Sequence, residues 1–295
     1  MSQIADLPIA VLAFVAGLFG LVTGSFLNVV IHRLPIMMER GWKRECRELL
    51  EADAPPTEKA EATEERYDLM MPGSTCPHCG HRIRAWENIP LLSWLVLRAR
   101  CSACGAGISI RYPLIELASG GGAALMVWQW GFTGTALAYT VMTWILIALS
   151  GIDIDHQLLP DSLTLPLLWL GMAVAGLGLT VPLEDALWGA IAGYLSLWSL
   201  FHAFRLLTGK EGMGAGDFKL LAALGAWLGW SQLPLVALMA SAVGAIGGGL
   251  LMATGLLARD SRIPFGPFLA AGGWVSMMWG ERIIAAYLGF VGLPS

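Results

Sequence analysis

Two groups of acidic residues lie beside long apolar stretches, where an ionisable side chain is costly and is treated as functional until a partner or water explains it. Asp153 lies in Gly151-Ile-Asp-Ile-Asp-His-Gln-Leu-Leu-Pro160, and Asp217 ends Gly214-Ala-Gly-Asp217. Two carboxylates held close together cannot both ionise cheaply, so one keeps its proton. The ionised group then activates a water molecule while the protonated group polarises a carbonyl. A carboxylate from each of the two groups therefore predicts the chemistry of an aspartic protease.

Each acidic residue also has a plain structural interpretation. An Asp that follows Gly before a helix, as Asp217 does, is most often only the N-cap of that helix. Asp161 follows Pro160 and is predicted to cap the next helix in the same way. Asp155 and His156 are predicted to be solvated loop residues.

Four of the five cysteines form two close pairs, Cys76-Pro-His-Cys79 and Cys101-Ser-Ala-Cys104. Two pairs at this spacing predict a tetrahedral zinc site with four thiolates, and a redox pair is the alternative. Four thiolates leave no open coordination position, so the zinc is predicted to be structural. The fifth cysteine, Cys46, is predicted to be a free thiol.

The composition indicates an integral membrane protein. Of the 295 residues 56% are hydrophobic and 14% are charged, with a mean hydropathy of +0.64. This is more apolar surface than a soluble fold of this length buries. The net charge is −4, but 12 of the 18 Lys and Arg residues lie between Arg33 and Arg111. This distribution indicates membrane topology and not nucleic-acid binding.

The hydropathy pattern predicts an all-α polytopic membrane protein with about eight transmembrane helices. A helix needs about 20 apolar residues to cross about 30 Å of hydrocarbon. The runs that satisfy or approach this length lie near 8–31, 113–131, 134–152, 162–180, 184–207, 217–231, 233–258 and 265–290. The sixth run is short, so it is expected to be tilted, sheltered by neighbouring helices or open to water at its start.

The distribution of basic residues predicts the orientation and the domains. The basic segment after the first helix is expected on the cytoplasmic side, which places both termini in the periplasm. Residues 1–31 are then the first membrane helix, 32–112 a cytoplasmic loop domain with the four-Cys site, and 113–295 a seven-helix membrane domain. On this topology Asp153 and Asp217 reach the same face of the membrane.

Four polar residues near the ends of the first two predicted helices are open to two interpretations. Asn28 and Glu116 either line a cavity or make hydrogen bonds between helices. His32 and Arg33 end the first helix and are predicted to be interfacial anchors.

The two acidic segments closely resemble those of the type IV prepilin peptidases, which use an Asp seven residues before a Pro and the Asp of a Gly-x-Gly-Asp motif. The resemblance implies that Asp153, rather than Asp155, and Asp217 are catalytic. Further segments match over about residues 15–275: Gly24-Ser-Phe-Leu-Asn-Val-Val-Ile-His-Arg-Leu-Pro35, Glu87-Asn-Ile-Pro-Leu-Leu-Ser-Trp94, Arg111-Tyr-Pro-Leu-Ile-Glu116 and Pro264-Phe-Gly-Pro-Phe268.

The resemblance also implies a substrate class and a second activity. It predicts cleavage after a Gly in type IV prepilins, or in pseudopilins of type II secretion, at the cytoplasmic face of the bacterial inner membrane. Some family members also methylate the new N-terminus with S-adenosylmethionine, and the cysteine-bearing region is the part connected with that activity. No residues for S-adenosylmethionine are predicted from the sequence.

Two other functions remain as alternatives at this stage. A presenilin-like intramembrane protease shares Gly-x-Gly-Asp, but it has neither the cysteine-bearing loop nor the motif Pro264-Phe-Gly-Pro267. A proton- or metal-coupled transporter also uses membrane carboxylates, but it favours positions near the bilayer midplane.

Overall fold

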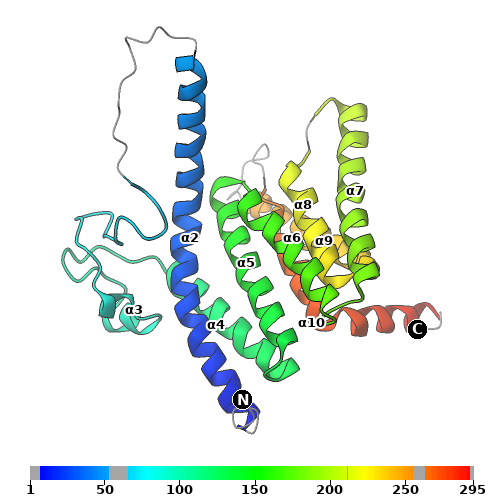
Figure 1. The fold of residues 1–295 in the computed structure, drawn as a ribbon, viewed down its shortest axis with the longest axis horizontal. Coiled ribbons are helices and arrows are strands. Elements are labelled where there is room, and N and C mark those ends of the chain that lie inside the picture. Colours follow the sequence, from blue (N-terminus) through cyan, green and yellow to red (C-terminus); the bar gives the residue numbers. More distant parts are fainter. Residues whose placement is uncertain (1–6, 53–65, 211, 255–262, 293–295) are drawn as a thin grey trace. The chain divides into compact units, whose positions relative to one another are not determined.

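The computed structural model describes residues 7–52, 66–210, 212–254 and 263–292 (Figure 1). All regular elements in these ranges are helices, accompanied by two isolated β-bridges, so the predicted all-α class is confirmed. The chain divides into two compact units, Met1–Trp128 and Gln129–Ser295. Each unit carries one of the two groups of residues singled out in the sequence.

The first unit is built on two long helices, α2 (Ile9–Ala52) and α4 (Arg111–Trp130). Helix α2 includes Pro35 and continues through the charged residues that follow the first apolar run, past its predicted end at Ile31. Between α2 and α4 lie the 3-10 helix η2 (Ala85–Asn88) and the short helix α3 (Leu92–Val96). The sequence Ala54-Pro55-Pro56, which argues against one continuous helix through this region, lies outside the described residues.

Small residues bring α2 and α4 into backbone contact. A Cβ added at Gly24 would lie 2.6 Å from the Cα atom of Glu116, so only glycine fits this crossing. One turn earlier, the hydroxyl of Ser119 donates a hydrogen bond of 2.6 Å to the carbonyl of Gly20. Close packing of small residues and hydroxyl groups is the usual way in which membrane helices associate.

The second unit has six helices, and α8 lies among the others. The helices are α5 (Gly134–His156), α6 (Asp161–Gly176), α7 (Leu183–Thr208), α8 (Ala215–Leu228), α9 (Leu233–Ala253) and α10 (Gly266–Val291), with the 3-10 helix η3 (Trp230–Gln232) before α9. Helix α8 packs against α6, α7, α9 and α10 (Figure 1). From Asp217 to Leu228 every residue except Lys219 is buried, so neighbouring helices shelter this short helix.

Specific contacts fix α8 between α6 and α7. A Cβ added at Gly189 would clash with the carbonyl of Gly225, which shows how closely α7 and α8 cross. On the other side, the indole N–H of Trp227 donates a hydrogen bond of 2.8 Å to the carbonyl of Leu167 in α6. Because both contacts are buried, they hold the axis of α8 and hence the position of Asp217 at its start.

The length and apolar character of the helices can be compared with the eight predicted membrane spans. In the described part of the chain, four helical stretches are long and apolar enough to cross a membrane: Ile9–Leu50, Gly134–His156, Leu183–Thr208 and Trp230–Gly247. Each of the eight predicted apolar runs coincides with a helix or with part of one. Helices α6 and α8 have only 16 and 14 residues, which is short for a membrane span.

Candidate active site and metal centre

Asp153 lies in the last turn of α5, and its carboxylate reaches the start of α10. Its side chain is buried, with 5% exposure. The backbone N–H of Gly266, the first residue of α10, donates a hydrogen bond of 2.9 Å to Oδ2 of Asp153. The first N–H groups of a helix have no partner within the helix, so a carboxylate is well placed there. The structure therefore anchors Asp153 against the motif Pro264-Phe-Gly-Pro267.

Asp217 lies in the first turn of α8 and is also buried, with 7% exposure. The prediction that Asp217 is the N-cap is wrong, because Gly214 is the N-cap and Asp217 is the third helical residue. Its Oδ2 atom accepts a hydrogen bond of 3.2 Å from the N–H of Gly214, as the acidic residue of a capping box does.

One leucine side chain fits between the two acidic segments. Leu159 is buried, and a Cβ added at Gly216 would lie 2.8 Å from its Cβ atom. A Cβ added at Gly266 would lie 3.0 Å from its Cδ2 atom. Leu159, which follows α5, thus contacts the first turn of α8 and the first turn of α10. The sequence singled out all three segments but not this contact.

The neighbouring acidic residues are arranged differently. Asp155 and His156 are exposed, as predicted, but they lie in the last turn of α5 and not in a loop. The predicted cap role of Asp161 is wrong, because Pro160 is the N-cap of α6 and no side chain caps it. The Asp161 carboxylate instead binds Nζ of Lys219 at 2.6 and 2.7 Å, and this ion pair joins α6 to α8.

For the leader cleavage that the family resemblance implies, we expect Gly266→Ala to lower the rate by about 10²-fold, the loss that a displacement of about 1 Å can cause at an active site. The new Cβ would lie 2.8 Å from Oδ2 of Asp153, so the carboxylate must move. The rate of cleavage of a prepilin substrate, measured on the folded variant, checks this. Gly249→Ala is the matched control, because nothing lies within 4 Å of a Cβ at that position. Equal rates for the two variants would contradict the placement of Asp153.

The four cysteines of the first unit form a cluster that could hold a metal ion. The Sγ atoms of Cys76, Cys79, Cys101 and Cys104 all lie within 4.8 Å of one another. The Sγ atoms of Cys76 and Cys104 are 3.9 Å apart. Zn–S bonds of about 2.3 Å in a tetrahedron give sulfur–sulfur distances of about 3.8 Å. Cys46, by contrast, is an exposed free thiol on α2.

The two cysteine pairs fold in the same way. The N–H of Gly80 donates to the carbonyl of Cys76 at 2.9 Å, and the N–H of Gly105 donates to that of Cys101 at 3.0 Å. Both glycines have φ near +70°, a conformation that other residues adopt only with strain. An isolated antiparallel bridge flanks each turn. Two such turns present four sulfur atoms to one point.

Backbone amides make two of these thiols acidic. The N–H groups of His78 and Cys79 lower the pKa of Cys76 to about 7. The N–H of Cys104 is the main cause of the lowered pKa of Cys101. Since the thiolate is the form that binds metal, this arrangement suits metal ligation.

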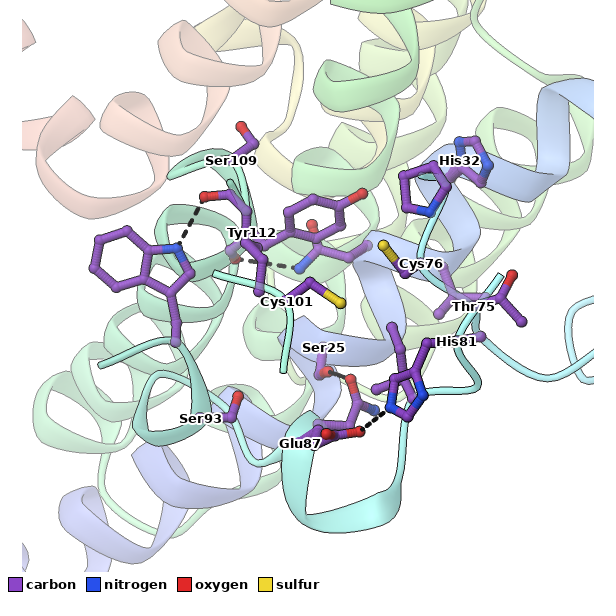
Figure 2. Close-up of a pocket in the computed structure, with 18 of the residues that line it drawn as sticks. Ser25, His32, Thr75, Cys76, His81, Glu87, Ser93, Cys101, Ser109 and Tyr112 are labelled. Atoms are coloured by element: carbon purple, nitrogen blue, oxygen red, sulfur yellow. Dashed lines mark hydrogen bonds and ion pairs between the residues drawn. The ribbon is translucent and has the colours of Figure 1, made fainter. Parts of the chain in front are cut away.

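The first unit also contains a cavity of about 530 Å³, lined by α2, the cysteine-bearing segment and the start of α4. Figure 2 shows Cys76, Cys101 and Tyr112 among its lining residues. Asn28 both lines this cavity and donates hydrogen bonds of 3.2 Å to the carbonyls of Gly24 and Tyr112, so both interpretations of this residue hold.

Two charged residues at this cavity are buried. The prediction that Arg33 is an interfacial anchor is wrong, because its side chain is buried with 7% exposure and lines the cavity. Glu116 is buried as well, with 8% exposure, and its Oε2 atom accepts a hydrogen bond of 2.8 Å from the N–H of Leu91.

A second carboxylate, that of Glu87, lines the same cavity as Cys76 and Cys101. Glu87 accepts a hydrogen bond of 2.8 Å from the N–H of Arg84 and another from the hydroxyl of Ser102, and both lower its pKa. The Nε2 atom of His81 lies 3.3 Å from Glu87 (Figure 2). The ionised form of Glu87 is thus favoured near the cysteine cluster.

The chain is similar to known protein families and to known proteins over most of its length. Residues 18–130 match the model of the bacterial peptidase A24 N-terminal domain, and residues 140–249 match that of the type IV leader peptidase family. A prepilin leader peptidase/N-methyltransferase of Stutzerimonas stutzeri is 55% identical over 99% of this chain and 100% of its own. Proteins of the same name from Pseudomonas aeruginosa and Aeromonas salmonicida are 54% and 55% identical, over 93% and 92% of both chains.

No solved structure is significantly similar to the chain. The two family models together cover most of the chain, and each falls largely within one of its two compact units. With this coverage and an identity above one half over almost the whole length, the chain belongs to the type IV leader peptidase family.

Proposed function

We propose that this chain removes the leader peptide of type IV prepilins or pseudopilins and then methylates the new N-terminus. The observation that carries the proposal is the pair of buried carboxylates, Asp153 and Asp217, held by the starts of α10 and α8. The full-length relatives bear the name of both activities. A presenilin-like protease and a transporter are not favoured by these relatives.

In the proposed cleavage, Asp153 and Asp217 share one proton. The ionised carboxylate takes a proton from a water molecule, which attacks the carbonyl of the Gly before the cut. The protonated carboxylate donates to the carbonyl oxygen, and the resulting tetrahedral intermediate collapses as the amine leaves with a proton. No covalent intermediate with the enzyme forms. The peptide bonds of Gly214 and Gly266 hold the two carboxylates and so fix the geometry of the reaction.

The four cysteines are proposed to hold a structural zinc ion. Cys76, Cys79, Cys101 and Cys104 supply four sulfur ligands at distances that suit a tetrahedron. A bound zinc ion would join the two halves of the cysteine-bearing segment, which otherwise has few buried apolar residues. The redox alternative would use only one pair at a time and gives no reason for the convergence of both.

The proposed location is the bacterial inner membrane, with about eight helices crossing the lipid bilayer and both termini in the periplasm. Residues 1–31 would be the first span, 32–112 the cytoplasmic loop domain and 113–295 the membrane domain with the protease site. The 12 basic residues between Arg33 and Arg111 support this orientation. The substrate's apolar helix would lie in the same bilayer, and nucleic acid has no proposed part.

The experiment that tests the function is incubation of the purified full-length protein in detergent with a prepilin-type substrate, with and without S-adenosylmethionine. The expected products are a leader peptide and a mature protein cut after the Gly, and the mature protein gains the mass of one methyl group only when the methyl donor is present. An intact substrate under both conditions would overturn the proposal.

A further inference from the structure

Arg33 is a buried cation that has no carboxylate partner in the described part of the chain. One Nη atom donates a hydrogen bond of 3.0 Å to the carbonyl of Asp68, and the guanidinium carbon lies 5.7 Å from the centre of the Tyr67 ring. A carbonyl and an aromatic ring compensate a buried charge only in part, and an unpaired buried charge is costly. The guanidinium has five N–H donors in a planar fork that fits a carboxylate. Its position at the cavity therefore points to an anionic ligand.

Two acidic side chains line the same cavity. They belong to Glu116 and Glu87, and both are almost completely buried. Each carboxyl group accepts a hydrogen bond from a backbone N–H, from Leu91 and Arg84 respectively. A ligand that carries both an anionic and a cationic group can pair with Arg33 and with these acidic side chains.

The size and lining of the cavity fit a small molecule. Its volume of about 530 Å³ lies within the range of about 300–1,000 Å³ that is typical of small-molecule sites. The Trp94 ring lines the cavity and is held there by a hydrogen bond of 3.2 Å from its N–H to the carbonyl of Ile108. An aromatic ring of this kind can stack on a base or contact a cation.

We infer that this cavity binds S-adenosylmethionine, with Arg33 binding the carboxylate of its methionine part and Glu116 facing its cationic groups. The inference rests on the methylation in the proposed function. S-adenosylmethionine carries a carboxylate, an ammonium group, a sulfonium group and an adenine ring, so its charges match those of the cavity.

The reaction at this site balances as a direct transfer. The N-terminal amine of the mature substrate, after loss of its proton to solvent, attacks the methyl carbon. The carbon–sulfur bond breaks, its electrons return to sulfur, and S-adenosylhomocysteine leaves as a neutral thioether. The product is the N-methylated ammonium, which carries the positive charge that the sulfonium has lost. Arg33 and Glu116 act here as binding residues, not as proton carriers.

The test is the binding of S-adenosylhomocysteine to the full-length protein in detergent, measured by calorimetry for the wild type, Arg33→Gln and Glu116→Gln. Arg33→Gln is expected to raise the Kd at least tenfold, the loss of a charge-assisted pair. Binding of methylthioadenosine, which lacks the amino-acid part, is expected to stay within twofold. Arg40→Gln is the matched control, since Arg40 is an exposed cation on the same helix and also lies over Tyr67.

Ligand-free stability separates binding from a structural role. Arg33→Gln removes an unpaired buried charge, so its ligand-free Tm is expected to match or exceed that of the wild type. If this variant does not fold, the isosteric Glu116→Gln decides, with a Kd for S-adenosylmethionine that rises at least fivefold.

Unchanged Kd values in both variants, with a methylating wild type, would overturn the site but leave the function. A raised KM for prepilin with an unchanged Kd would reassign the cavity to the leader peptide. A wild type that neither binds nor methylates would remove the methylation itself.

Discussion

Asp153→Asn and Asp217→Asn are each expected to lower kcat for leader cleavage by about 10³- to 10⁴-fold, the range in which positioned general acids and bases act. Asn has nearly the same size as Asp but can neither take a proton from water nor donate one to a carbonyl oxygen. It can still accept a hydrogen bond, so the contacts with Gly214 and Gly266 can persist in the variants. Single-turnover cleavage in detergent measures the loss.

Asp155→Asn provides the matched control for both variants. Asp155 is on the same helix as Asp153, two residues away, but it is exposed. We expect this variant to cleave within threefold of the wild type. If Asp155→Asn abolished cleavage while folded Asp153→Asn retained it, the assignment of the catalytic pair would be wrong.

Cys76→Ser is expected to remove the bound metal and unfold the cysteine-bearing segment. A structural zinc ion in a small domain contributes about 10–16 kcal/mol of apparent binding free energy, which such a segment cannot replace by apolar burial. The metal content, measured by mass spectrometry, is expected to fall from about one zinc per chain to almost none. Limited proteolysis between residues 66 and 110 should become at least tenfold faster. Since Cys76 lines the cavity, methyl transfer should be lost as well.

Cys46→Ser controls for the loss of a thiol. Cys46 is exposed on α2 and is not part of the cluster, so the metal content and the rate of proteolysis should not change. A Cys76→Ser protein with a full complement of zinc would show that the four sulfur atoms do not form the proposed site.

The sequence was sufficient for those features that depend on local pattern. Apolar runs of membrane length predicted where each long helix occurs, because burial in lipid requires such runs whatever the tertiary contacts. The two cysteine pairs predicted a four-sulfur cluster, since their turns are set by residues close in sequence. Asp153 was chosen over Asp155 because of its motif. In the structure Asp153 is buried and Asp155 is exposed, which favours the same choice.

Features that depend on contacts distant in sequence were not predictable. The partner of Asp153 is the N–H of Gly266, 113 residues away, and a backbone donor leaves no signal in residue type. Asp161 looked like a helix cap, but its partner is Lys219, 58 residues away. Arg33 ends an apolar run and so resembled an interfacial anchor, yet the segment around Asp68 covers it. In each case tertiary packing decides the role.

The central claim is that Asp153 and Asp217 act as one unit that holds a single proton. The most direct test is the pH dependence of kcat/KM for leader cleavage, measured on the wild type and on Asp155→Asn. At low pH both carboxylates are protonated and no base remains, whereas at high pH both are ionised and no acid remains. We therefore predict a bell-shaped profile, the same for both proteins. A rate that rises with pH to a plateau would contradict the shared proton, because a single ionised base would then be sufficient.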